Sequence, residues 1–355
     1  MTATTPVVPR SAPDAEASPL LETRGLTKHF KIGGTFSRRT LHAVDGADIV
    51  IGRKQIVALV GESGSGKSTI ARLLARVYRP TAGEIRYQGR SLAEMRTRRQ
   101  SMGYRGDVPM VFQDPFSSLN PAYRVSHGIL RGLKLHRPEL DRTSRRTEAE
   151  RVVAAVGLTP ATDVLDRYPH ELSGGQRQRI GFAQALAYRP KLILADEPVS
   201  MLDVSIRIGL LNVMAKLRAE EDVSFLYITH DIASARYVAD RLIVMYAGHI
   251  VESGRTEDVL GRPKHPYTQL LLSAVPDPRA PLSVGAASGK DEPPRVIDPA
   301  EGCRFRWRCP YAIDVCSAVT PQLRPLGVAH TAACHVARAD DDLASTDATQ
   351  GKKGA

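Results

Sequence analysis

Short runs of hydrophobic residues alternate along the chain with stretches that carry hydrophobic residues at helical spacing. The run Gln55–Val60 is rich in β-branched residues and stops at a glycine, which predicts a buried strand. Similar runs cover residues 192–195 and 223–228, and they lead to the polar residues Asp196 and His230. Alternating strands and helices predict an α/β fold with a largely parallel sheet, whose ligands bind at the carboxyl ends of the strands.

Hydrophobic spacing and composition divide the rest of the chain into segments. Leu20–Phe30 has the pattern of a strand, and residues 114–171 are polar with helical spacing of their apolar positions. Residues 276–300 are rich in Pro, Gly and Ala, which predicts a linker. A small unit with four cysteines follows at 301–337. Both ends, 1–18 and 338–355, have the composition of disordered segments.

Composition narrows the classes of function. The 355 residues are 42% hydrophobic and 25% charged, which is ordinary for a globular protein. The net charge of +11 is compatible with nucleic acid, an anionic membrane surface or a phosphate ligand. The arginine runs 96–99 and 142–146 lack interleaved aromatic residues, which argues against binding of single-stranded nucleic acid. Without a spanning apolar run or a signal peptide, we expect a cytosolic protein that reaches a membrane through partners.

Residues Gly61–Thr69 fit the phosphate-loop pattern GxxxxGK[ST], between a predicted strand and a helix expected at Thr69–Tyr78. Glycines allow backbone N–H groups to converge on phosphate oxygens, and the helix N-terminus attracts negative charge. Lys67 would neutralise the β- and γ-phosphates and Ser68 would bind Mg²⁺. The competing interpretation is a chance glycine-rich turn. The candidate ligands are Gly61, Ser63, Gly64, Ser65, Gly66, Lys67, Ser68 and Thr69.

Asp196 and Glu197 follow the predicted strand at 192–195. Asp196 can hold Mg²⁺ through water, and Glu197 can polarise an attacking water as a general base. Alone, such a pair is more often a cap at the surface. Its distance after a phosphate loop favours the catalytic interpretation.

The phosphate loop, Gln113, Leu172–Gln176, Asp196-Glu197, Asp203 and His230 occur in an order and spacing that resemble those of ATP-binding cassette (ABC) ATPases. The resemblance covers about residues 20–275. It implies the fold of a P-loop NTPase: a RecA-like core with a parallel sheet, an antiparallel β subdomain and a helical subdomain at about 114–180. We therefore expect a nucleotide-binding domain at 19–275, followed by the linker and the small cysteine-bearing module.

The resemblance also implies roles. Gln113 belongs to the Q-loop that contacts Mg²⁺ or water, and His230 is the switch histidine that senses the γ-phosphate. Asp203 lies in the D-loop at the dimer seam, where Met201 replaces the common Ala. Phe30 is the candidate for stacking on adenine, with Phe36 as the alternative. The signature loop, which completes the partner cassette's ATP site, comprises Ser173, Gly174, Gly175 and Gln176.

The later part of the chain resembles ATPases of oligopeptide, dipeptide and nickel importers. The resemblance rests on Phe112–Pro121, on His265–Thr268 and on the cysteine module that begins at Gly302. Some members carry a [4Fe-4S] cluster, here implied at Cys303, Cys309, Cys316 and Cys334. Their spacing, C-x5-C-x6-C-x17-C, lacks the short pairs of zinc ribbons, and Arg304, Arg306 and Arg308 would offset an anionic cluster. Zinc or four reduced thiols are the alternatives.

The resemblance implies ATP-driven peptide import from the cytoplasmic face of the bacterial inner membrane. Its partners would be a second cassette (identical or paralogous), two membrane-spanning permeases and, indirectly, an external peptide-binding protein, without nucleic acid. A groove near residues 113–125 would receive the permeases. Nickel or oligosaccharide import stays open, as do an exporter and a soluble ABC ATPase acting on ribosomes or DNA.

Overall fold

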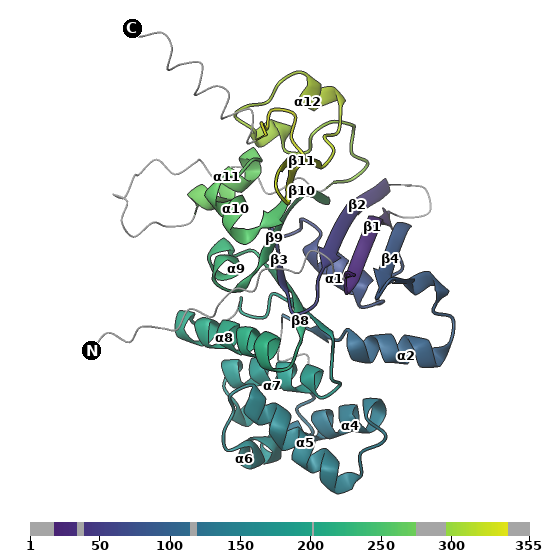
Figure 1. The fold of residues 1–355 in the computed structure, drawn as a ribbon, viewed down its shortest axis with the longest axis vertical. Helices are drawn as coiled ribbons and strands as arrows, with labels where there is room; N and C mark the ends of the chain where they lie inside the picture. Colours follow the sequence, from purple (N-terminus) through teal and green to yellow (C-terminus); the bar gives the residue numbers. More distant parts are fainter. Residues whose placement is uncertain (1–17, 34–38, 114–118, 201, 275–295, 340–355) are drawn as a thin grey trace, which may run out of the picture.

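The computed structural model describes residues 18–33, 39–113, 119–200, 202–274 and 296–339. The phosphate loop follows a strand of the larger sheet, and three regions surround that sheet in Figure 1. An antiparallel sheet lies on one side, a lobe of helices lies below, and the C-terminal region lies above, next to β10. Within the described residues, no helix has the length and apolar character needed to cross a membrane.

The larger sheet has the strand order β11-β12-β10-β9-β3-β8-β7-β6, and the smaller one has the order β2-β1-β4-β5. Strands β9, β3, β8, β7 and β6 pair in parallel, and β10, β12 and β11 continue the sheet antiparallel. The strands are β1 (Leu21–Ile32), β2 (Arg39–Ile51), β3 (Ile56–Val60), β4 (Ala82–Tyr87), β5 (Arg90–Ser91), β6 (Met110–Val111), β7 (Leu192–Asp196), β8 (Ser224–Thr229), β9 (Arg241–Tyr246), β10 (His249–Arg255), β11 (Arg324–Gly327) and β12 (His330–Ala332).

Helices cover the sheets and form the lower lobe (Figure 1). The helices are α1 (Lys67–Leu74), α2 (Arg98–Asp107), α4 (Val125–His136), α5 (Arg142–Ala155), α6 (Ala161–Asp166), α7 (Gly174–Leu186), α8 (Val204–Glu220), α9 (Ile232–Val238), α10 (Thr256–Gly261), α11 (Pro266–Ser273) and α12 (Val315–Ala318). The short 3-10 helices are η1 (Leu92–Glu94), η2 (Pro169–Glu171) and η3 (Arg306–Arg308).

Strand β3 explains why the core has two sides. All five of its residues are buried, and alternate side chains point to opposite faces of the sheet. Ile56, Ala58 and Val60 join the core shared with the helical lobe. Val57 and Leu59 join the core shared with α1 and the antiparallel sheet. A continuous apolar run is therefore required at this strand, as expected for a strand covered on both faces.

The expected α/β cassette fold is confirmed, with a parallel core, an antiparallel sheet and a helical lobe. One boundary differs, because the helix after the phosphate loop is Lys67–Leu74 and not Thr69–Tyr78. It ends early because Arg76 has the left-handed φ of +57° and the chain then turns toward β4.

The C-terminal region is less separate than the sequence indicated. Its strands β11 and β12 extend the large sheet from β10, so that this region shares hydrogen bonds with the catalytic core. Part of the expected linker is also paired with the cassette, because the backbone N–H of His42 donates to the carbonyl of Val296 at 2.9 Å and Leu41 bridges to Ile297. The expected disordered ends lie outside the described residues, except at their inner margins.

Candidate active site

The loop between β3 and α1 surrounds its own lysine. Lys67 Nζ donates to the carbonyl oxygens of Gly61 and Glu62, both at 2.8 Å, and the side chain is buried. Burial lowers the pKa of Lys67, although the negative charges of Glu197, Asp196 and Glu62 oppose this shift. Because an anionic ligand would offset the lowering, this buried ammonium group suits the phosphates of a nucleotide.

Gly66 allows the loop to close against β2. Its φ is +107°, and a Cβ atom there would stand 2.2 Å from the carbonyl oxygen of Ala43. The next residue begins α1, whose N-terminal N–H groups face the loop and favour phosphate. Of the remaining predicted ligands, Thr69 lies in the first turn of α1, and the others lie along the loop, at Gly61, Ser63, Gly64 and Ser65.

Ser68 and Asp196 form a pair of oxygen ligands at the end of β7. Ser68 Oγ donates to Asp196 Oδ1 at 2.9 Å. Burial raises the pKa of Asp196, and the hydrogen bond from Ser68 opposes that rise. Hydroxyl and carboxylate oxygens suit Mg²⁺, and a divalent cation would hold Asp196 in its charged form. The donor set therefore fits Mg²⁺ bound together with a nucleotide, and such an ion neutralises charge on the phosphates.

The ends of three neighbouring parallel strands bring Gln113, Glu197 and His230 together. Gln113 Nε2 donates to Glu197 Oε2 at 3.1 Å, and His230 Nδ1 lies 3.4 Å from the same oxygen. The backbone of Glu197 has φ +46°, and its N–H donates to the carbonyl of Ile228 at 3.0 Å. This carboxylate is therefore held in place by its neighbours and can accept a proton from a water molecule.

The signature loop begins α7 in the helical lobe, whereas the phosphate loop begins α1 beside the sheets (Figure 1). Ser173 and Gln176 form a reciprocal cap, with the Gln176 N–H donating to Ser173 Oγ at 3.2 Å and the Ser173 N–H donating to Gln176 Oε1 at 2.9 Å. The capping role that the sequence suggested for Ser173 is thus present. A Cβ at Gly175 would meet Ile206 Cγ2 at 2.4 Å, so the loop packs tightly on α8.

Two further predicted residues lie at the edges of the site. Phe30 is half-buried on β1, where its ring meets Tyr78 edge to face at 5.3 Å between centroids, and Lys28 Nζ lies 5.0 Å from its centroid. Asp203 is exposed at the N-terminus of α8. The alternative aromatic Phe36 and the replaced position Met201 lie outside the described residues.

The structure adds contacts to the phosphate loop that the sequence did not indicate. Arg308, in the cysteine-bearing region, donates from both terminal nitrogens to the Glu62 carboxylate, at 2.9 and 3.1 Å. The Tyr267 hydroxyl accepts from the backbone N–H of Glu62 at 2.9 Å. Arg308 and Glu62 are 246 positions apart, and the spacing of the arginines indicated only positive charge near the cysteines.

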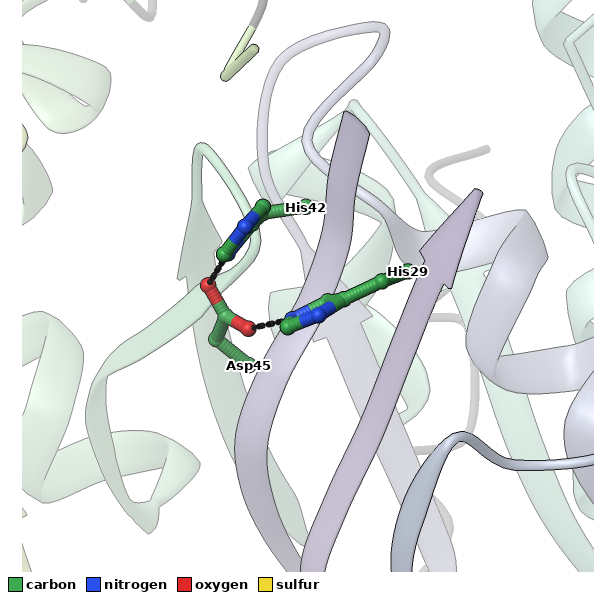
Figure 2. Close-up of side chains that lie close together, drawn as sticks. All are labelled: His29, His42 and Asp45. Carbon is green, nitrogen blue, oxygen red and sulfur yellow. Dashed lines mark hydrogen bonds and ion pairs between the residues drawn. The ribbon is translucent and has the colours of Figure 1, made fainter. Parts of the chain in front are cut away.

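A second junction, between the C-terminal region and the antiparallel sheet, is centred on Asp45 of β2 (Figure 2). His29 and His42 each hydrogen bond to one of its carboxylate oxygens, and their rings stack at 3.7 Å. Among the described residues, His29, His42 and Asp45 form the group whose possible ligand atoms lie close enough together, within 4.8 Å, to hold a metal ion. Arg304 also pairs with Asp45, and His249 Nε2 lies 3.7 Å from it, so the carboxylate is already neutralised by protein groups. We interpret the cluster as a polar junction rather than a cation site.

Comparison with known proteins agrees with this geometry. Residues 44–200 match the family model "ABC transporter", and residues 251–316 match "Oligopeptide/dipeptide transporter, C-terminal region". A putative peptide import ATP-binding protein of Brucella ovis is 42% identical over 322 residues, which cover 89% of this chain and 98% of that protein. The chain belongs to the ABC transporter ATP-binding proteins of the oligopeptide/dipeptide transporter family. The oligopeptide transport ATP-binding protein AppF of Bacillus subtilis is 40% identical, covering 91% of this chain and 98% of AppF.

Solved structures support the ABC cassette fold. The post-hydrolysis dimer of the ATP-binding cassette MJ0796 with ADP and Pi has a TM-score of 0.59 and 26% identity, covering 66% of this chain and 98% of that one. CbiO1 of Clostridium perfringens, part of the transporter complex cbiONQ, has the same TM-score with 24% identity, covering 69% and 92%. As a member of the ABC family with this site, the chain is an ATPase.

Proposed function

We propose that this ABC ATPase powers the import of peptides across the bacterial cytoplasmic membrane. The observation that carries the proposal is the C-terminal region, because its match to oligopeptide and dipeptide transporters covers residues 251–316. The matches to two relatives named for peptide or oligopeptide import cover 98% of the length of each relative. Import of nickel or of oligosaccharides by the same machinery is the alternative within the family, and a soluble ABC ATPase is the alternative outside it.

Within the ATP site we assign roles from the geometry. Glu197 is the general base, held by Gln113 and switched by His230, since both contact its Oε2 atom. Lys67 and the phosphate loop bind the phosphates, and Ser68, Asp196 and Gln113 surround Mg²⁺. Phe30 stacks on adenine, because it is the half-buried aromatic ring of the described part of β1.

The active unit in this proposal is a pair of cassettes that close on two ATP molecules. We assign Ser173–Gln176 to an ATP held by the other cassette, because they begin α7 in the helical lobe, whereas Lys67 begins α1 beside the sheets (Figure 1). Asp203 lies at the seam, exposed at the start of α8. The related cassette MJ0796 is described as a dimer. The second cassette is another copy of this chain or a paralogue.

A groove between β6 and α7 provides a docking site for the permeases. It has a volume of about 490 Å³ and lies beside Gln113, where coupling to the ATP site is direct. Residues 109–112 form one wall, directly before the segment 113–125 expected from the sequence, of which 114–118 lie outside the described residues. The opposite wall comprises Arg177, Gln178, Gly181, Gln184, Ala185 and Tyr188.

This docking places the chain at the cytoplasmic face of the membrane as a peripheral subunit. Its partners are two membrane-spanning permeases, and an external peptide-binding protein delivers the substrate to them. We expect no nucleic-acid partner, because Lys67 and the phosphate loop, which would bind phosphate, belong to the nucleotide site.

We further propose that Cys303, Cys309, Cys316 and Cys334 hold a [4Fe-4S] cluster. Burial raises the pKa of Cys303, and the charges of the other three thiolates raise it further, so an anionic set here needs a compensating cation. The backbone N–H of Phe305 opposes this rise of the Cys303 pKa, and hydrogen bonds to sulfur tune iron–sulfur clusters.

The spacing of the cysteines along the chain favours a cluster over a single zinc ion, because C-x5-C-x6-C-x17-C lacks the short pairs of zinc ribbons. Iron and acid-labile sulfide assays on anaerobically purified protein should find four of each per chain. Zinc without sulfide, or metal-free protein, would contradict the cluster.

Transport itself distinguishes the proposed function from its alternatives. The chain, its two permeases, the partner cassette and the binding protein encoded beside it are reconstituted in proteoliposomes. We expect ATP-dependent uptake of labelled di- to pentapeptides, which is lost with Lys67→Ala. Uptake of nickel or an oligosaccharide with no peptide uptake would overturn the peptide assignment, and co-purification with ribosomes or DNA would favour the soluble class.

A further inference from the structure

Two arginines of the C-terminal region connect it to the cassette, and one of them, Arg308, contacts the phosphate loop. Arg304 follows Cys303 and donates to the carbonyl oxygen of Ala247 at 2.5 Å, as well as pairing with Asp45. Arg308 precedes Cys309 and forms the two-point contact with Glu62. The short segment between the two cysteines is thus attached to the cassette at both of its ends.

Glu62 is the second residue of the phosphate loop, and all of its polar groups are engaged. Its N–H donates to the Tyr267 hydroxyl at 2.9 Å, and its carbonyl accepts from Lys67 Nζ at 2.8 Å. Its carboxylate is held by Arg308. The residue that supports Lys67 is therefore itself held by α11 on one side and by the cysteine-bearing region on the other.

The charge of Glu62 makes this contact important for nucleotide binding. Its carboxylate acts electrostatically on Lys67, which shows that its field reaches the place where the phosphates bind. A free carboxylate there would repel a triphosphate and compete with it for Lys67. In the structure its charge is offset by the guanidinium group of Arg308, which lies at 2.9 and 3.1 Å from its two oxygens. The two side chains are 25% and 22% exposed, so solvent screens the pair only in part.

We propose that Arg308 is a positioning residue for ATP, through which the C-terminal region keeps the phosphate loop ready to bind nucleotide. By neutralising and restraining Glu62, Arg308 leaves Lys67 free to exchange its backbone carbonyls for phosphate oxygens. The C-terminal region thereby acts on the affinity of the cassette for ATP, and not on the chemical step at Glu197.

Arg308 lies over the rings of Tyr246 and Phe305, at 5.9 and 6.0 Å from their centroids, but it is one of several contacts that hold the region in place. Phe305 is buried, and its ring packs against Tyr246, Tyr267 and His265 at centroid distances of 5.2 to 5.6 Å. Strands β11 and β12 also remain paired to the sheet. Removing one guanidinium group at the surface of this interface therefore leaves the region docked.

The test is Arg308→Gln, with Arg306→Gln as its matched control. Arg306 lies in the same 3-10 helix, bonds to the carbonyl of Cys303 and packs over Trp307 within the C-terminal region. We expect Arg308→Gln to raise KM for ATP, and the Kd of a fluorescent ATP analogue, about 3-fold to 10-fold with kcat within about twofold. Arg306→Gln should leave both values unchanged. An unchanged KM in Arg308→Gln, or equal effects in the two variants, would overturn the proposal.

The double variant separates charge from general damage. Because Glu62→Gln removes the charge that Arg308 neutralises, adding it to Arg308→Gln should return KM to within about twofold of the wild type. Glu62→Gln alone should show a similar value. If the double variant binds ATP as weakly as Arg308→Gln, or more weakly, neutralisation of Glu62 is not the function of Arg308. A melting temperature close to that of the wild type would show that each variant is folded.

Discussion

The side-chain amide of Gln113 donates to Glu197 Oε2 at 3.1 Å, across 84 positions of sequence. Gln113 follows β6, at the point where the chain leaves the sheet for the helical lobe, and Glu197 ends β7. The contact therefore connects the lobe that carries the signature loop to the carboxylate that we assign as general base. Movement of the lobe relative to the sheet would change the position of that carboxylate.

Replacing Gln113 should lower turnover more than it changes ATP binding. Gln113 and His230 both contact Glu197 Oε2, and in Gln113→Ala only the contact with His230 remains. We expect kcat to fall about tenfold with little change in KM. Steady-state hydrolysis gives both constants. Gln269→Ala is a matched control, because Gln269 lies on α11 and its exposed side-chain amide donates to the carbonyl oxygen of Pro263. A variant with wild-type kcat would show that Glu197 does not depend on Gln113.

Gly175 should tolerate no side chain unless α8 makes room for it. A methyl group there would stand 2.4 Å from Ile206 Cγ2, and such crowding in a packed interface costs about 1–3 kcal/mol. We expect Gly175→Ala to displace the signature loop and lower ATPase activity several-fold. Adding Ile206→Ala removes the colliding methyl group and should restore much of the activity.

Gly181→Ala provides the control on the same helix. Its methyl group would meet Val111 Cγ1 at 3.6 Å, an ordinary contact, so we expect activity close to that of the wild type. If Ile206→Ala fails to rescue Gly175→Ala while both proteins remain folded, the loss has a cause other than this collision. Thermal unfolding of each variant reports on folding independently of activity.

His265 should make stability depend on pH. Burial lowers its pKa to about 4, while Glu252 opposes the shift. The unfolded chain binds a proton at this residue near pH 6.5 and the folded chain only near pH 4, so stability is lost as pH falls through this window. At about 1.36 kcal/mol per pKa unit, the loss reaches roughly 3 kcal/mol at its lower end.

The substitution His265→Asn removes this titration. In the wild type, the backbone N–H of Tyr267 donates to His265 Nδ1 at 3.0 Å, and the side-chain oxygen of asparagine can accept that hydrogen bond instead. We therefore expect the difference in Tm between wild type and His265→Asn to shrink, or change sign, from pH 7 to pH 4.5. His127→Asn, at an exposed position of α4, should keep the wild-type dependence. Parallel Tm curves for wild type and His265→Asn would contradict the assignment.

Local sequence patterns predicted the core strands and placed the candidate site residues at their ends, because both follow from short-range rules. The apolar runs at 192–195 and 223–228 required strands buried on both faces, and they became β7 and β8. Parallel strands place their carboxyl ends at one edge, and this brought Asp196 to Ser68 of the phosphate loop and His230 to Glu197. Motif order alone identified Gln113, whose local sequence has no distinctive pattern.

Contacts between distant segments were not predictable in the same way. The pairing of Arg308 with Glu62, and of Arg304 with Asp45, depends on how β11 and β12 join the sheet at β10. No periodicity in residues 301–337 reports that pairing. Residues 296–298, at the end of the expected linker, bond to β2 through backbone groups and the Asp298 carboxylate, and the Pro-, Gly- and Ala-rich pattern of the linker does not indicate these contacts.

The most direct test of the central claim, that this site hydrolyses ATP through Glu197, compares the wild type with Glu197→Gln. The amide keeps the size and hydrogen bonds of the side chain but cannot accept a proton from water. We predict an unchanged Kd for ATP and a kcat lowered by at least about 100-fold, as for removal of a general base. Hydrolysis by Glu197→Gln at a rate near that of the wild type would contradict the account.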